Sequence, residues 1–425
     1  MENCMQNGRY PNSTNIQRQL LPNGVTVLVY ENFASQSVVV EGVVRAGSLA
    51  DRKETAGLAR LTSSTLMRGT QQRRFDQIYE ALESVGAHLH FSSGYHTAGF
   101  SAQGLVEDMD LLLDMAADVL RQPTFFEEQV NKVRSQILTI LQMRANDTGQ
   151  RANLAFHELL YGEHPYGRSR GGYSETVATL TRPHLADFHS RYYGPQGMII
   201  TVVGAVKAQT AVDKVAALFG DWHNEGQEAL TTVPDKPRPE KRLQTHVAMP
   251  DKHQVDIRLG LPGPRRSAPD YLDASLMNTI LGVFGMMGRI GQNVREEQGL
   301  AYVAYSQLQG GLGPLPWTAV AGVAPDVVDK AIQSILDEIV RIQDELVTAA
   351  ELADSQAYRT GSMPMALETN NGLADIITDM ELLELGLDYL LEYPAAVRAI
   401  TPERIQTAAQ KYLSTKQIGV AVAGP

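Results

Sequence analysis

The chain repeats one pattern of secondary structure after about 220 residues. The stretch LTRPHLADFHSRYYGPQGMIITVVGAV begins at Leu180, and ITPERIQTAAQKYLSTKQIGVAVAGP begins 220 residues later at Ile400. Each copy is typical of a helix capped by threonine, a turn containing Gly or Ser, and an apolar strand. A second pair, a strand followed by an amphipathic helix, repeats with an offset of 218 residues when Gly104 is aligned with Gly322. One long repeat of this kind predicts two homologous domains rather than a solenoid.

The length of the chain and a polar stretch at its middle indicate where the domains divide. With 425 residues, the chain exceeds what one hydrophobic core usually organises. Residues 224–241, NEGQEALTTVPDKPRPEK, have the composition of an exposed linker. We therefore predict an N-terminal domain over residues 1–223 and a C-terminal domain over residues 242–425. Strands and helices alternate in runs in each half, which favours an α+β fold with mostly antiparallel sheets packed with helices.

Composition excludes several classes of protein. The net charge is −11 and the sequence has no basic stripe, which argues against binding to nucleic acid. Hydrophobic residues make up 43% of the chain and charged residues 20%, as is typical of soluble globular proteins. We find no run of about 18 apolar residues, so no membrane span is expected.

Cysteine usage and the N-terminus bear on the compartment. Cys4 is the one cysteine in the sequence, which excludes an internal disulfide and a thiolate zinc site. The first residues, MENCMQNGRYPNSTNIQRQ, are polar and lack the apolar core of a signal peptide. We expect a cytoplasmic protein, or a periplasmic one if a leader peptide has been removed.

Residues 57–70, GLARLTSSTLMRGT, have the pattern of an apolar helix that ends at glycine. This stretch resembles the zinc-site helix of the pitrilysin/insulinase metallopeptidases, which typically reads GLAHLLEHMLFKGT and carries the motif H-x-x-E-H. VVVEGVVRAGSLAD (residues 38–51) and HPYGR (residues 164–168) resemble the same family. The resemblance runs from about Leu20 to the C-terminus. It implies that two homologous domains form half of a clam-like chamber around unfolded peptide.

The three positions that carry zinc chemistry in that family hold other residues here. Two histidines four residues apart on a helix share one face and bind Zn²⁺, and the glutamate between them acts as general base. The matching positions are Arg60, Ser63 and Ser64. Arg60 is cationic and has no lone pair to donate, so it would repel Zn²⁺. Ser63 is a poor base, and Ser64 is a weak ligand compared with imidazole.

A third zinc ligand, a glutamate, is implied by the resemblance on a later helix. The matching stretch is QILTILQMR, residues 136–144, and its candidate ligand positions are Thr139 and Ile140, followed by Leu141. None of these side chains is acidic. Because three parts of one site are missing, we predict that this chain binds no metal there and has no cofactor of its own.

The second half keeps a pair of residues that the family uses. The segment NTILGVFGMMGRIGQNVREEQGLAYVAYS (residues 278–306) resembles the family stretch that ends R-E-x-x-G-L-A-Y, with Arg295 and Tyr302 seven residues apart. The resemblance implies that this pair reaches the zinc site, binds peptide and stabilises the developing oxyanion, for which a guanidinium and a phenol are suitable donors. On spacing alone, the two residues would be a helix cap and a packed aromatic.

Glycines precede that pair at Gly282, Gly285, Gly288 and Gly291. No GK[ST] follows, so they do not form a phosphate-binding loop. The noncatalytic subunit of the mitochondrial processing peptidase has a glycine-rich loop in this region that helps to admit substrate, and the resemblance implies a similar loop here. The alternative is a helix start with close packing.

Histidines on a predicted strand offer a different metal hypothesis. His88 and His90 alternate and therefore share one strand face, although such histidines are more often surface or chamber-lining residues. In the family, the matching strand offers its edge to the substrate peptide by β-augmentation. Residues 91–101 are therefore expected to form a groove wall.

These observations together favour a noncatalytic subunit of a heterodimeric zinc metallopeptidase that acts on peptides or unfolded proteins. The partner chain would supply H-x-x-E-H, the distal glutamate and the zinc, and this chain would supply Arg295 and Tyr302. One alternative is a structural protein of the same fold, such as the core proteins of the respiratory chain that are related to the processing peptidase. Others are a standalone peptide-binding module and an enzyme with a different metal site.

Overall fold

The computed structural model describes residues 10–228 and 233–425. Cys4 and residues 229–232 of the predicted linker lie outside the described residues. The chain forms two compact units that interleave in sequence: unit 1 contains Met1–Leu141, Arg170–Thr232 and Pro364–Glu392, and unit 2 contains Gln142–Ser169, Val233–Met363 and Tyr393–Pro425. Each unit therefore takes a segment from the other half of the chain. The sequential boundaries at residues 223 and 242 stay a prediction for the two repeated halves.

Unit 1 is built on a six-stranded sheet. Its strand order is β1-β2-β6-β3-β5-β4, and every neighbouring pair is antiparallel except β2 and β6. The strands are β1 (Ile16–Leu20), β2 (Thr26–Glu31), β3 (Ser37–Val44), β4 (His88–Ser93), β5 (Ala98–Leu105) and β6 (Ile199–Gly204).

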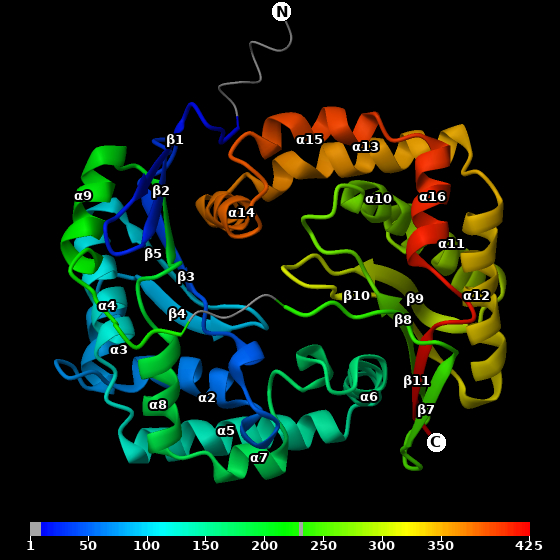
Figure 1. Ribbon diagram of the computed structural model, residues 1–425, viewed down its shortest axis with the longest axis horizontal. Helices are drawn as coiled ribbons and strands as arrows, with labels where there is room; N and C mark the ends of the chain where they lie inside the picture. The colour runs from blue at the N-terminus through cyan, green and yellow to red at the C-terminus, as the bar shows by residue number, and fades with distance from the viewer. Residues whose placement is uncertain (1–9, 229–232) are drawn as a thin grey trace, which may run out of the picture. The chain divides into compact units, whose positions relative to one another are not determined.

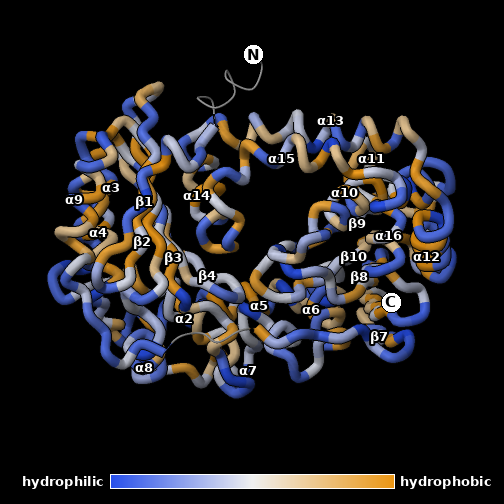
Figure 2. Tube along the Cα trace, turned by 45° about the horizontal axis from the view of Figure 1, so that its top comes forward, coloured by the Kyte–Doolittle hydropathy of each residue, from blue (hydrophilic) through white to orange (hydrophobic). Residues whose placement is uncertain are grey.

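Helices cover both faces of this sheet. In Figure 1, α4 and α9 lie on one face and α14 lies on the other, which agrees with the contacts of these helices. Val38 and Val40 alternate toward the α4 side, where they join Leu112 and Leu113 in one buried core. Figure 2 shows hydrophobic residues along β2 and β3. The helices are α2 (Leu58–Thr65), α3 (Phe75–Glu83), α4 (Met109–Arg121), α5 (Glu127–Ala145), α7 (Ser174–Thr179), α8 (Arg182–Tyr192), α9 (Ala208–Phe219) and α14 (Asn370–Leu382).

Unit 2 is built on a five-stranded sheet whose strand order matches that of unit 1, except that β1 has no counterpart. Its strand order is β7-β11-β8-β10-β9, and only β7 and β11 are parallel. The strands are β7 (Leu243–Ala248), β8 (Val255–Pro262), β9 (Ala301–Leu308), β10 (Pro316–Val323) and β11 (Gly419–Gly424). The predicted duplication and the mostly antiparallel sheets are confirmed.

The helices of unit 2 again lie on both faces of the sheet. The helix α6 packs against β7, β8 and β11, whereas α10, α11 and α12 lie on the other face (Figure 1). The chain passes from unit 2 into unit 1 within α13 and returns within α15. The helices are α6 (Thr148–Tyr161), α10 (Tyr271–Gly282), α11 (Phe284–Gly291), α12 (Val328–Asp344), α13 (Ala349–Ala366), α15 (Tyr389–Arg398) and α16 (Pro402–Tyr412).

Short helical turns complete the described structure. A π-helical turn, η6 (Gln292–Glu297), follows α11 directly. The 3-10 turns are η1 (Ser48–Ala50), η2 (Lys53–Thr55), η3 (Leu66–Arg68), η4 (Val106–Asp108), η5 (Pro165–Gly167) and η7 (Pro325–Val327). No helix in the described part of the chain has both the length and the apolar character that crossing a membrane requires.

Candidate functional site

The start of helix α2 in unit 1 is held by a buried carboxylate and by close packing of glycines. The buried Asp51 carboxylate accepts hydrogen bonds from the backbone N–H groups of Gly57 and Ala59, each at 2.9 Å, and so caps the start of the helix. Gly57 has φ +96°, and a Cβ there would lie 2.9 Å from the Cα of Gly172. This position therefore favours glycine, because a side chain would be both strained and crowded.

Arg60 places a positive charge on the face of α2 where the family has a histidine. Its guanidinium is partly buried, and its pKa is lowered by that burial and by the positive charge of Arg170. The Arg170 guanidinium lies 4.9 Å from the centre of the Tyr95 ring. A guanidinium stays protonated at neutral pH even when its pKa falls, so two cations act on this side of the helix. A third cation would be repelled here.

The two serines of α2 differ in their surroundings. Ser63 is buried, and its Oγ donates to the carbonyl oxygen of Arg60 at 3.1 Å, within the same helix. Ser64 is exposed to solvent. The Ser63 hydroxyl thus binds its own backbone, as serines inside helices often do.

The later helix, α5, presents the other two predicted positions to solvent. Ile137 and Leu141 are buried in the core that also contains Leu61 of α2. Thr139 donates to its own helix, at the carbonyl oxygen of Ser135, and Ile140 is 46% exposed. Over the residues that the structure describes, no group of three or more His, Cys, Asp or Glu is arranged to hold a metal ion.

Arg295 and Tyr302 lie on the surface of unit 2. Arg295 is within η6, and its side chain is 37% exposed with an ion pair of 3.4 Å to Glu296. Tyr302 is the second residue of β9, a terminal strand of its sheet, and is 86% exposed. The alternative of a packed aromatic is therefore wrong for Tyr302.

Side chains beside Arg295 hold the π-helical turn against α12. Asn293 donates to the buried Glu338 carboxylate at 2.6 Å. Gln298 donates to the side chains of Asn293 at 2.6 Å and Ser334 at 2.9 Å. Because π-helical turns are rare and often occur at functional sites, this fixed turn is a suitable place for a functional arginine.

The predicted glycine-rich loop is instead a junction between two helices. Gly282 ends α10, and Gly285, Gly288 and Gly291 lie within α11. A Cβ at Gly288 would lie 2.6 Å from the backbone N of Gly282, so the two helices approach closely there. The close-packing alternative therefore describes this segment better than an open loop.

A polar cavity in unit 1 was not predicted. It has a volume of ≈ 560 Å³ and lies between the sheet and α14. Glu41, His90 and Arg170 line it, together with Asp375 and Asp379. Glu41 interrupts the apolar strand SVVVEGVV, and that interruption is the one sequence signal that could have drawn attention to it. The strand β4, which carries His88 and His90, is terminal in its sheet, as the groove-wall prediction requires.

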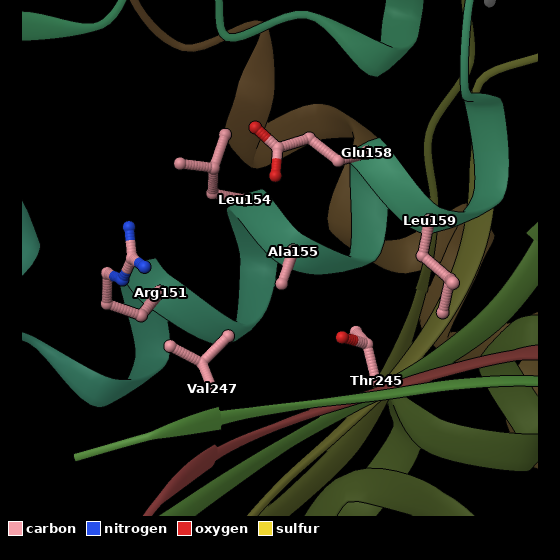
Figure 3. Close-up of a pocket in the computed structure, with 7 residues that line it drawn as sticks. All are labelled: Arg151, Leu154, Ala155, Glu158, Leu159, Thr245 and Val247. Carbon is pink, nitrogen blue, oxygen red and sulfur yellow. The ribbon is translucent and has the colours of Figure 1, made fainter.

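A smaller pocket of ≈ 220 Å³ lies in unit 2 between α6 and the terminal strand β7. Figure 3 shows Val247 and Thr245 of β7 opposite Ala155 and Leu159 of α6. Its volume is below the range of about 300–1,000 Å³ that is usual for small-molecule sites. We assign it to packing at the edge of the sheet.

Comparisons with known proteins agree with this fold. The chain is 28% identical to an uncharacterized zinc protease of Mycobacterium leprae over 97% of this chain and 92% of that protein. It is 23% identical to a probable mitochondrial-processing peptidase subunit beta of Arabidopsis thaliana, over 95% of this chain and 77% of that protein. A crystal structure described as a peptidase M16 inactive domain from Pseudomonas fluorescens has a TM-score of 0.91 and 25% identity, covering 97% of this chain and 98% of that one.

Two family models match successive parts of the sequence. The model of the insulinase (peptidase family M16) domain matches residues 26–172. The model of the peptidase M16 inactive domain matches residues 179–358. The resemblance to the pitrilysin/insulinase peptidases is thereby confirmed, and this chain belongs to the M16 peptidase family.

Proposed function

We propose that this chain is a noncatalytic subunit of a heterodimeric zinc metallopeptidase whose metal is bound by the partner chain. One contrast carries the proposal. Arg60, Ser63 and Ser64 replace the zinc chemistry of α2, whereas Arg295 and Tyr302 keep the family's residue types in accessible positions. A protein that only served as a scaffold would have no need of that second pair.

The pair has the chemistry for a carbonyl group under attack. The Arg295 guanidinium and the Tyr302 phenol both donate hydrogen bonds, and both are exposed enough to meet a peptide. Donors placed where negative charge develops commonly contribute about 100-fold or more to turnover. The partner's zinc would polarise the same carbonyl and supply the attacking water.

Peptides and unfolded proteins are the substrate class that suits this fold. Terminal strands such as β4 and β9 can pair with an extended peptide through backbone hydrogen bonds, which impose little sequence preference. The names of two relatives support the assignment to a pair of chains: one is called a peptidase subunit, and the other an inactive domain.

The experiment is to change Arg295 and Tyr302 in the complex with a chain that carries H-x-x-E-H. R295A/Y302F should lower peptide turnover about 100-fold while the two chains still associate, because the pair acts on the reacting carbonyl. The matched control is R242A/Y358F, which alters an exposed arginine and tyrosine of the same unit and should leave turnover unchanged. Full activity of R295A/Y302F would favour the scaffold or peptide-binding alternatives.

A further inference from the structure

The segment Pro364–Glu392, here called the strap, belongs to unit 1 although it comes from the second half of the chain. Arg18 of β1 forms a two-point ion pair with Glu381, at 2.7 and 3.0 Å. Asp388 accepts hydrogen bonds from the backbone N–H and the hydroxyl of Ser13, each at 2.9 Å. These contacts hold the C-terminal part of the strap to the start of the chain.

The N-terminal part of the strap is held by Asn370. Its amide donates to the Oγ of Ser37 at 2.9 Å and accepts from the amide of Asn32 at 2.7 Å. Between the two ends, the helix α14 buries Ala374 and Ile377 completely. The strap is therefore a separate element, fastened at both ends and packed through its middle.

A row of side chains crosses the sheet on the face that α14 covers. Register pairs link one residue on each of the six strands, so all six side chains share a face. From one edge to the other, the row is Arg18, Leu28, Thr201, Glu41, Ser101 and His90.

The strap meets the centre of that row through Thr378. The buried Thr378 Oγ1 lies 2.7 Å from the Oγ1 of Thr201 and donates to the Oε2 of Glu41 at 3.2 Å. Glu41 lines the polar cavity together with Asp375 and Asp379, and the charges of both aspartates act on it. A carboxyl group of the sheet is thus enclosed by two carboxyl groups of the strap.

This arrangement disfavours a charged Glu41. Neighbouring carboxylates repel one another, so ionising Glu41 beside the two aspartates of the strap costs free energy. Burial, followed by the charge of Asp375, raises the pKa of Glu41 to about 8.

The other charged groups near this centre are few and can be named. His90 of β4 and Arg170 line the same cavity. Arg45, which follows the last residue of β3, interacts electrostatically with Glu384 of the strap. The charges that shift the pKa of Glu41 are those of Asp375 and Asp379, and both raise it.

We propose that the strap is a proton-dependent closure: it docks firmly on the sheet when Glu41 carries a proton and loosens when Glu41 is ionised. The device is independent of the proposed peptidase role, because every group that it uses lies in unit 1 of this chain. Near neutral pH the strap is poised to respond to small changes of pH or to a charge brought into the cavity.

The direction of the pH effect follows from linkage. With the strap open, Glu41 has an ordinary carboxyl pKa near 4.5, whereas with the strap closed its pKa is about 8. Closure is therefore strongest below about pH 4.5, weakens as the pH rises from there to about 8, and is constant above that value. The limiting slope is about tenfold in the opening equilibrium for each pH unit.

Amide hydrogen exchange with the intact chain tests the proposal. After correction for intrinsic exchange rates, opening of α14 should rise more than about tenfold between about pH 5.5 and about pH 8.5. The helix α9 of unit 1 and α6, the helix on the corresponding face of the sheet in unit 2, serve as internal references. A ratio of α14 to reference exchange that does not change with pH would overturn the proposal.

Three variants separate the titration of Glu41 from a general loss of stability. E41Q keeps a neutral hydrogen-bonding group, so the exchange of α14 should no longer depend on pH. D375N removes the largest opposing charge, so the pH window should move to lower values even if E41Q folds poorly. E381Q breaks the ion pair with Arg18 and should raise exchange of α14 while the pH dependence remains. Wild-type pH dependence in E41Q, or an unchanged pH window in D375N, would contradict the mechanism.

Discussion

Arg60 occupies the position at which a metal-binding member of the family has its first histidine. The guanidinium is fixed as a cation, and Arg170 adds a second positive charge that acts on it. Positive charge therefore disfavours a cation on this face of α2, where both histidine positions also lack a metal ligand.

At the residue scale, R60H/S64H should bind Zn²⁺, because two imidazoles four residues apart on one helix face can share a metal ion. S64H alone should not, since Arg60 remains beside the single imidazole. Competition with a chromophoric zinc chelator measures both affinities. Equal binding by the single and double variants would show that replacing Arg60 with a histidine does not create a zinc site on this face of α2.

The sequence alone brings together the candidate site residues of α2, but not the residues that line the cavity. Arg60, Ser63 and Ser64 lie within one helix, so their spacing alone places them on related faces. Glu41 could have been noticed as a carboxyl group in an apolar strand, but its partner Thr378 is 337 residues away. No local pattern in the chain links the two.

At the scale of elements, the duplication could be predicted from the sequence. The exchange of helices between the two halves of the chain could not. The repeat predicted two similar sheets, and both have one parallel pair at the corresponding place. An amphipathic helix shows that it has a face to bury, and the pattern does not say against which sheet. The placement of α6 in unit 2 and of α14 in unit 1 therefore had to come from the structure.

The junction between α10 and α11 offers a matched pair of glycines. Gly285 and Gly288 have similar φ values of +62° and +68°, but a Cβ at Gly285 has open space, whereas one at Gly288 would meet backbone atoms at 2.6 Å. G285A should therefore destabilise unit 2 by about 1–2 kcal/mol through backbone strain alone. G288A should lower the free energy of unfolding by a further ~1–3 kcal/mol through overpacking.

Urea denaturation followed by the fluorescence of the two tryptophans, Trp222 in unit 1 and Trp317 in unit 2, measures these changes. The buried Trp317 reports on the unit that contains both glycines. If the two variants have equal stability, α10 and α11 are not closely packed at Gly288, and the glycine-rich segment is a loop after all.

At the scale of the whole molecule, the family could be recognised from the sequence because segments typical of it occur in both halves of the chain. These segments are the stretch that resembles the zinc-site helix, the segment HPYGR and the stretch that resembles R-E-x-x-G-L-A-Y. They are spread from residue 57 to residue 302. The proposed role as one half of a two-chain enzyme rests on the zinc-site residues that are missing in the first half and on the Arg295/Tyr302 pair that is present in the second.

Zinc content and peptide cleavage, determined together for this chain, for a partner with H-x-x-E-H and for their mixture, test that assignment most directly. We predict that neither chain alone cleaves an unfolded peptide efficiently, and that the mixture is active with about one zinc per pair, bound by the partner. Cleavage by this chain alone, with zinc bound to it, would contradict the proposed division of roles.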